Sequence, residues 1–187
     1  QHDGTLEDYA NLAEGLLTLY QTTFEERFFV AARELADAIL AHFEAPDGGF
    51  FDTADDAEQL MARPRNLQDN AVPSGGAMAT TVLLRLAALT GDSRYRDAAE
   101  RALAPIVGIA AQHPTGFAQW LTAYRLASAP IDEIAIVGDP APGSIALALT
   151  WVPFDTELQM LVPSVVRCGG DGVPATNTAA PTTGSPR

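Results

Sequence analysis

An internal repeat with a fixed offset of 67 residues constrains the fold of this chain more than any other feature. Leu16-Leu17-Thr18-Leu19 aligns with Leu83-Leu84-Arg85-Leu86, and the match continues without a gap to Ile39 and Ile106. Identical residues recur at Thr23 and Thr90, Arg27 and Arg94, and Ala31-Ala32 and Ala98-Ala99. A unit that recurs in this way is typical of helical repeat architectures, in which each copy is one supersecondary element.

Each copy of the repeat has the pattern of two helices joined by a short turn. Leu12, Leu16, Leu19 and Tyr20 recur at spacings of three and four, which predicts an amphipathic helix. In the second copy, Thr90-Gly91-Asp92 supplies a helix-ending glycine and an N-capping aspartate. We therefore predict helices at residues 6–22, 25–43, 74–90, 93–111 and 115–127.

These helices predict a mainly α fold, a partial α/α toroid of helix hairpins over residues 1–129. A simple bundle of four or five helices is the alternative. The connection between the two hairpins spans roughly 27 residues, whereas bundle connections usually have about 2–8 residues. The long connection favours the toroid. Truncation of a toroid would leave apolar stripes uncovered at both ends, at Leu12, Leu16 and Leu19 and at Phe117, Trp120 and Tyr124. We therefore expect a two-fold homodimer through these open flanks.

The pattern changes after residue 129. Residues 131–137 alternate and are rich in β-branched side chains, which predicts a strand in a short C-terminal segment, 130–168. Residues 145–152 fit either a strand or a short helix. Residues 169–187 consist mostly of Gly, Pro, Ala, Ser and Thr, which predicts a disordered tail.

Composition limits the classes of partner. The formal charge of −13 disfavours nucleic acid and anionic membranes, because like charges repel. No stretch is apolar enough to span a bilayer, and no leader pattern opens the chain at Gln1, so we expect a cytoplasmic piece of a longer protein. Cys168 is the only cysteine, and the three histidines share no common spacing. We therefore expect no metal site and no cofactor.

The long connection and the helix starts carry the candidate site. The repeat register aligns Ser74 with Glu7, so the polar residues before the two helices should gather at one end of the array. Carboxylates, an amide and an aromatic ring are suited to binding sugar hydroxyls and sugar faces. The predicted substrate-binding residues are Glu7, Asp8, Tyr9, Asp69, Asn70 and Ser74.

Other interpretations of these residues stay open. Ser74, Asp69 and Asp8 are also typical helix caps. Asp52 and Asp69 are candidates for a catalytic carboxylate pair, which in glycosidases requires a separation of roughly 5–9.5 Å. Gly75-Gly76 favours close helix packing over phosphate binding, because no lysine of a phosphate-binding loop follows.

Several of these segments resemble a known family, the YyaL-like, spermatogenesis-associated thioredoxin-domain proteins. Residues 6–17 are similar to its "DYA…EGLL.LY" segment and residues 48–53 to its "GGFFDT" segment. Residues 69–75 resemble its "DNATPSG" signature, with Val72 in place of threonine. The resemblance covers about residues 5–140, and residues after Pro140 match poorly.

The resemblance implies an (α/α)6 toroid similar to six-hairpin glycosidases and N-acylglucosamine 2-epimerases, preceded by a thioredoxin-like domain in the parent protein. This chain would hold the last hairpins, and Cys168 would echo a C-terminal cysteine segment of the family. The leading hypothesis is a carbohydrate-related toroid that binds or processes a sugar, as an epimerase or glycosidase does. The alternative is a non-catalytic helical scaffold that supports the thioredoxin-like domain or a protein partner.

Overall fold

The computed structural model describes residues 4–57 and 62–129, and this part of the chain is mainly helical. The elements in chain order are α1 (Leu6–Thr23), α2 (Glu26–His42), α3 (Gly75–Thr90), α4 (Ser93–Leu103), α5 (Val107–Gln112), the 3-10 helix η1 (Pro114–Gly116) and α6 (Ala118–Ser128). The predicted mainly α class is confirmed. The predicted strand at 131–137, the segment 145–152, the tail from residue 169 and Cys168 all lie outside the described residues.

The first hairpin, α1 and α2, begins and ends where its local sequence dictates. The Thr5 hydroxyl and the Asp8 carboxylate form a capping box at the start of α1. Phe24 ends the helix in the left-handed conformation, with φ of 59°, and its N–H donates to the Tyr20 carbonyl. The buried face of α1 consists of Leu6, Ala10, Ala13, Leu17 and Tyr20.

The second hairpin, α3 and α4, repeats this arrangement with different caps. Ser74 caps α3, Gly91 ends it with φ of 70°, and Asp92 caps α4, as the sequence predicted. α3 is buried along most of its length, because it packs against α1, α4 and α6. Its first residues, Gly75 and Gly76, allow close approach: a Cβ on Gly75 would lie 3.0 Å from the backbone nitrogen of Glu7.

One predicted helix is divided. We predicted a continuous helix over residues 93–111, but α4 ends at Leu103 and α5 begins only at Val107. Pro105 lies in the break, where it can donate no N–H to the carbonyl of Arg101 and its ring would clash with that carbonyl in a continuing helix. The other four predicted helices agree with the structure to within three residues.

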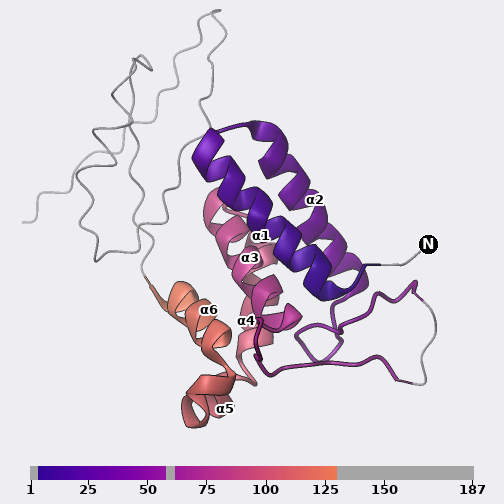
Figure 1. Ribbon diagram of the computed structural model, residues 1–187, viewed down its shortest axis with the longest axis vertical. Coiled ribbons are helices and arrows are strands. Elements are labelled where there is room, and N and C mark those ends of the chain that lie inside the picture. The colour runs from indigo at the N-terminus through magenta and orange to yellow at the C-terminus, as the bar shows by residue number, and fades with distance from the viewer. Residues whose placement is uncertain (1–3, 58–61, 130–187) are drawn as a thin grey trace, which may run out of the picture.

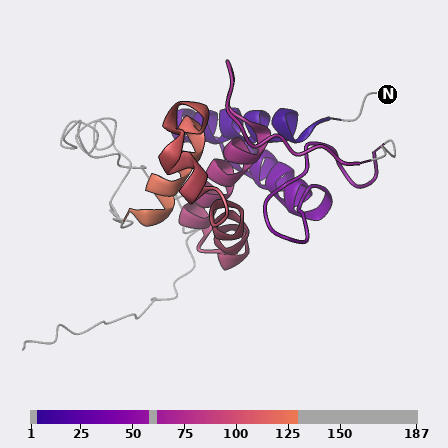
Figure 2. The same cartoon turned by 90° about the horizontal axis from the view of Figure 1, so that it is seen from below.

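The helices form two layers (Figure 1). α1, α3 and α6 pack side by side, while α2 covers α1 and α4 covers α3. Seen from below, α2 and α6 lie on opposite sides of the molecule (Figure 2). Tyr95 on α4 joins the two outer helices, since its hydroxyl donates to an Asp37 oxygen on α2 at 2.8 Å. Alternating inner and outer helices of this kind form a section of an α/α toroid. No helix among the described residues is both long enough and apolar enough to cross a membrane.

The two flanks of this section differ from each other. On α1, Leu12 and Leu19 are 56% and 45% exposed, as the truncation argument predicted, but Leu16 is partly buried and packs against the core. At α6, Tyr124 is exposed and Phe117 is partly buried against the core, but the prediction that Trp120 is uncovered was wrong: this side chain is only 2% exposed. Its indole N–H donates to the Leu67 carbonyl at 2.8 Å, and its ring packs over Gly76, where the missing side chain leaves room.

Candidate functional site

A polar pocket lies where the starts of α1 and α3 meet the long α2–α3 connection. Its volume is about 180 Å³, and its wall mixes carboxylate, amide and hydroxyl groups. The lining residues are Thr5, Glu7, Asp52, Asn66, Gln68, Asn70, Val72, Pro73, Ser74 and Gly75. Four residues predicted from the sequence therefore share one cavity: Glu7, Asp52, Asn70 and Ser74. The repeat register placed the two helix starts side by side, and the structure agrees.

The connection reaches the pocket through a tight turn after α2. Gly48 and Gly49 both adopt positive φ, 92° and 78°, and the chain reverses so that the Phe51 N–H donates to the Phe43 carbonyl. The turn is followed by Asp52, whose backbone oxygen accepts from the Leu6 N–H at 3.0 Å. This bond attaches the connection to the first turn of α1.

The two pocket carboxylates differ in their surroundings. One Asp52 oxygen, Oδ2, accepts the Asn66 backbone N–H at 2.9 Å, and Oδ1 has no hydrogen bond within the described residues. Glu7 lies in the exposed first turn of α1, where the N-terminal end of the helix dipole stabilises a negative charge. Its carboxylate has no partner in the described part of the chain. Together they leave three carboxylate oxygens free to accept from a ligand.

Asp69 is buried and joins the starts of two helices. Its Oδ1 accepts the Ser74 N–H and its Oδ2 accepts the Gln119 N–H, both at 2.8 Å. Its own N–H donates to the Gly116 carbonyl. The side chain is not part of the pocket wall, although its neighbours Asn70 and Ser74 are. Asp69 therefore holds the N-terminal end of α3 in a fixed position relative to the N-terminal end of α6.

Asp8 and Tyr9 also lie outside the pocket wall. The Asp8 carboxylate accepts from both the backbone N–H and the hydroxyl of Thr5 at 2.8 Å. These two hydrogen bonds lower the pKa of Asp8 below its ordinary value, with the backbone bond contributing most. The ring of Tyr9 packs against that of Phe43, with ring centroids 5.2 Å apart. Asp8 and Tyr9 therefore stabilise the first turns of α1 without lining the pocket.

The sequence analysis did not identify three of the polar lining residues, Thr5, Asn66 and Gln68. Thr5 was recognisable as the residue three before Asp8, the spacing of a capping box. Asn66 and Gln68 carry no such local signal, because their position depends on the path of the connection. That path is set by Arg65, which donates to the Asp47 carboxylate and to the Gly48 carbonyl.

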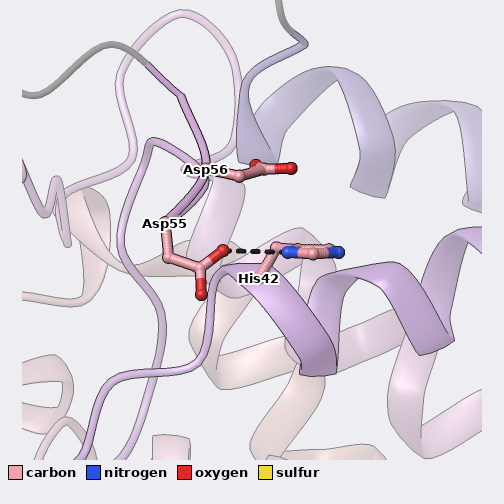
Figure 3. A group of neighbouring side chains, drawn as sticks. All are labelled: His42, Asp55 and Asp56. Atoms are coloured by element: carbon pink, nitrogen blue, oxygen red, sulfur yellow. Dashed lines mark hydrogen bonds and ion pairs between the residues drawn. The ribbon is translucent and has the colours of Figure 1, made fainter.

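A second cluster of polar side chains lies apart from the pocket lining, at the C-terminal end of α2. His42 closes the last turn of α2, and its Nδ1 lies 2.8 Å from an Asp55 oxygen (Figure 3). Asp56 is adjacent, and one potential ligand atom from each of the three residues lies within 4.8 Å of the others. The hydrogen bond to Asp55 raises the pKa of His42 above its ordinary value. The sequence analysis expected no metal site, and the 13-residue separation between His42 and Asp55 gives no recognisable motif.

Comparison with known proteins identifies the fold. Residues 12–124, more than half of the chain, match glycosyl hydrolase family 47. Spermatogenesis-associated protein 20 of Mus musculus is 29% identical over 174 residues, 92% of this chain and 21% of its own length. The protein of the same name in Homo sapiens is 30% identical over 138 residues, 73% of this chain. The resemblance deduced from the motifs is confirmed, and the chain spans about a fifth of the length of these relatives.

Proposed function

We propose, on the premise that this chain belongs to glycosyl hydrolase family 47, that the pocket between the starts of α1 and α3 binds the hydroxyl groups of a saccharide. The observation that carries the proposal is the composition of the pocket wall. Carboxylate, amide and hydroxyl groups converge there from two helix starts and one connection. Sugar hydroxyls both donate and accept hydrogen bonds, so a wall that offers both kinds of partner suits them.

The negative charge of the pocket wall indicates which class of saccharide the pocket can bind. Glu7 and Asp52 are acidic, and the lining contains no lysine, arginine or histidine. At an effective dielectric constant of about 20, a ligand anion about 6 Å from one carboxylate would be repelled by roughly 3 kcal/mol. The first turn of α1 already holds the carboxylates of Glu7 and Asp8, and Ser74 caps α3, so the helix starts offer a ligand anion little further attraction. We infer that the pocket binds a neutral saccharide rather than a sugar phosphate or a uronic acid.

The two catalytic candidates take different roles in this proposal. Asp52 lines the pocket, and its Oδ1 accepts no hydrogen bond from the residues that the structure describes, so this oxygen is available to a ligand hydroxyl. Both Asp69 oxygens accept backbone N–H groups. We therefore assign Asp69 to positioning Asn70 and Ser74, and Asp52 to direct contact with the ligand.

Titration calorimetry of the 187-residue chain with a saccharide panel tests the proposal. We expect binding of one or more of glucose, mannose, galactose and N-acetylglucosamine, and none of glucose 6-phosphate or glucuronate. Glu7→Gln and Asp52→Asn should each weaken binding about 10-fold, because a hydrogen bond to a charged group contributes about 1.5 kcal/mol or more. Glu34→Gln, an exposed substitution on α2, serves as the control and should bind as the unaltered chain does. Absence of binding by every sugar would contradict the proposal.

A second candidate function is a non-catalytic scaffold for a thioredoxin-like domain or another protein. The observation that favours it is the apolar stripe on α1, where Leu12 and Leu19 are exposed. The saccharide panel distinguishes the two functions. A scaffold would bind no saccharide, and the calorimetric titrations of Glu7→Gln and Asp52→Asn would be the same as those of the unaltered chain.

A further inference from the structure

The cluster of His42, Asp55 and Asp56 has the composition of a metal site. It combines an imidazole from the end of α2 with two carboxylates from the connection that follows Thr53 (Figure 3). These side chains belong to two separate stretches of the chain and point into one small region. None of them lines the saccharide pocket, so the cluster is independent of the proposed function.

The backbone that carries the three ligands is fixed by its own hydrogen bonds. The Asp55 N–H donates to the His42 carbonyl at 3.0 Å. The Arg63 guanidinium donates to the carbonyls of both His42 and Thr53 and stacks on the Phe51 ring, 4.2 Å from its centroid. The helix end and the connection are therefore held together without the help of the ligand side chains.

The electrostatics at this place favour a cation. The carboxylates of Asp55 and Asp56 carry two negative charges, and the Arg63 guanidinium near Asp55 offsets one of them, so a metal ion that takes the place of the proton on His42 would meet a net charge of −1 from these described residues. The cluster also lies at the C-terminal end of α2, where the helix dipole presents partial negative charge. The carboxylates and the helix dipole therefore both attract a cation.

The spacing of the ligand atoms suits a tetrahedral ion with small adjustments. In a zinc site with bonds of about 2.0–2.1 Å, neighbouring ligand atoms lie about 3.3 Å apart. Here His42 Nδ1 and Asp55 Oδ1 are 2.8 Å apart, and no pair among the three potential ligand atoms exceeds 4.8 Å. His42 is only partly buried and both aspartates are exposed. Side-chain rotations that move the ligand atoms by about one ångström or less therefore meet little steric resistance.

We propose that His42, Asp55 and Asp56 bind a first-row divalent cation, zinc being the best fit, through one imidazole nitrogen and two carboxylate oxygens, with water completing the coordination. The imidazole ligand selects zinc over calcium and magnesium, which prefer all-oxygen sites. The open side toward solvent provides the position for water.

Calorimetric titration of the metal-stripped 187-residue chain with ZnCl₂ is the test, with CaCl₂ and MgCl₂ as comparison ions. We expect one zinc site per chain and no comparable heat from calcium or magnesium. His42→Ala and Asp56→Asn should each weaken zinc binding 10-fold or more. His113→Ala, which removes an exposed histidine that follows α5 and is not part of the cluster, is the matched control and should leave affinity unchanged.

A second measurement locates the ion. Manganese added in substoichiometric amount should broaden the ring proton signals of His42 and leave those of His113 sharp, because paramagnetic broadening falls steeply with distance. Circular dichroism of each variant establishes that it is folded. Zinc binding that survives in the folded His42→Ala and Asp56→Asn variants, absence of a zinc site in the unaltered chain, or equal broadening of both histidines would overturn the proposal.

Discussion

At the scale of single residues, Asp69 shows how a polar side chain can be essential to a site without contacting a ligand. Its two oxygens accept the N–H of Ser74, the N-cap residue of α3, and the N–H of Gln119 in the first turn of α6. Asp69→Asn replaces one of these oxygens with an NH₂ group that cannot accept, so one buried N–H loses its partner. We expect the free energy of unfolding to fall by about 1–3 kcal/mol, measured by urea denaturation.

The control for this prediction is Asp97→Asn, which makes the same chemical change on the exposed face of α4. It should alter the free energy of unfolding by less than about 0.5 kcal/mol. Equal stability of the two variants would show that the bonds to Ser74 and Gln119 contribute little in solution.

The pH dependence of the α1 start is set by Asp8. The Thr5 backbone N–H and hydroxyl both bond the ionised carboxylate, so the pKa of Asp8 is lower in the folded chain than in the unfolded chain. The stabilisation of the cap is therefore present above the unfolded pKa, near 3.8, and is lost as pH falls through the folded pKa.

We predict that Thr5→Ala raises the pKa of Asp8 toward 3.8, because the hydroxyl bond is removed. An NMR titration of the Asp8 carboxyl carbon in both chains measures this change directly. A pKa of Asp8 that is unchanged by the substitution would mean that the hydroxyl does not bond the carboxylate.

At the scale of the elements, the sequence was most informative about the helices and least informative about the connections. Helix periodicity and caps are local, so four of five helices were predicted to within three residues. Pro105 was overlooked as a breaker because the 67-residue register pairs the apolar face of 93–111 with that of the first copy. The register also brought Glu7 and Ser74 together correctly, because equivalent helices of a repeat start at the same end.

The parts of the site that could not be predicted depend on tertiary contacts. Asn66 and Gln68 reach the pocket because Arg65 anchors the connection to the turn at Asp47 and Gly48. His42 meets Asp55 because Arg63 binds carbonyls on both segments. Neither arrangement follows from periodicity or from the spacing of residues along the chain.

The contact between the starts of α1 and α3 gives a prediction at this scale. A Cβ on Gly75 would lie 3.0 Å from the Glu7 nitrogen and 3.3 Å from its Cα, and the neighbouring Leu6 N–H is tied to the Asp52 carbonyl. Gly75→Ala must therefore push two helix starts apart, and we expect it to destabilise the chain by about 1–3 kcal/mol.

Gly15→Ala is the matched substitution in the interior of α1, where a Cβ would meet nothing within 4 Å. Alanine is the better helix former, so this variant should gain about 0.5–1 kcal/mol. Thermal denaturation of the two variants should thus give shifts of opposite sign. Shifts of the same sign would show that the packing of α1 against α3 is looser than the structure describes.

At the scale of the whole molecule, the exposed flank of α1 gives a prediction about the association of the chain. Leu12 and Leu19 are exposed on α1, and Leu16 lies between them, partly buried against the edge of the core, so that the three leucines form a stripe at spacings of four and three. Burying one leucine contributes about 1.5–3 kcal/mol, and this stripe has no cover within the described residues. In a purified sample, a second copy of the chain can cover it.

We therefore predict a concentration-dependent two-fold dimer, since a stripe on one helix is self-complementary when two copies meet across an axis. Sedimentation velocity at micromolar concentration should show it, and the double variant Leu12→Glu, Leu19→Glu should sediment as a monomer because four carboxylates would then face one another. Ile109→Glu is the control: Ile109 is similarly exposed, at 46%, but lies on α5 away from the stripe. This variant should dimerise as the unaltered chain does, because its new charge would lie outside the interface. A monomer at every concentration tested would contradict the prediction, and the double variant would then give the same sedimentation profile as the unaltered chain.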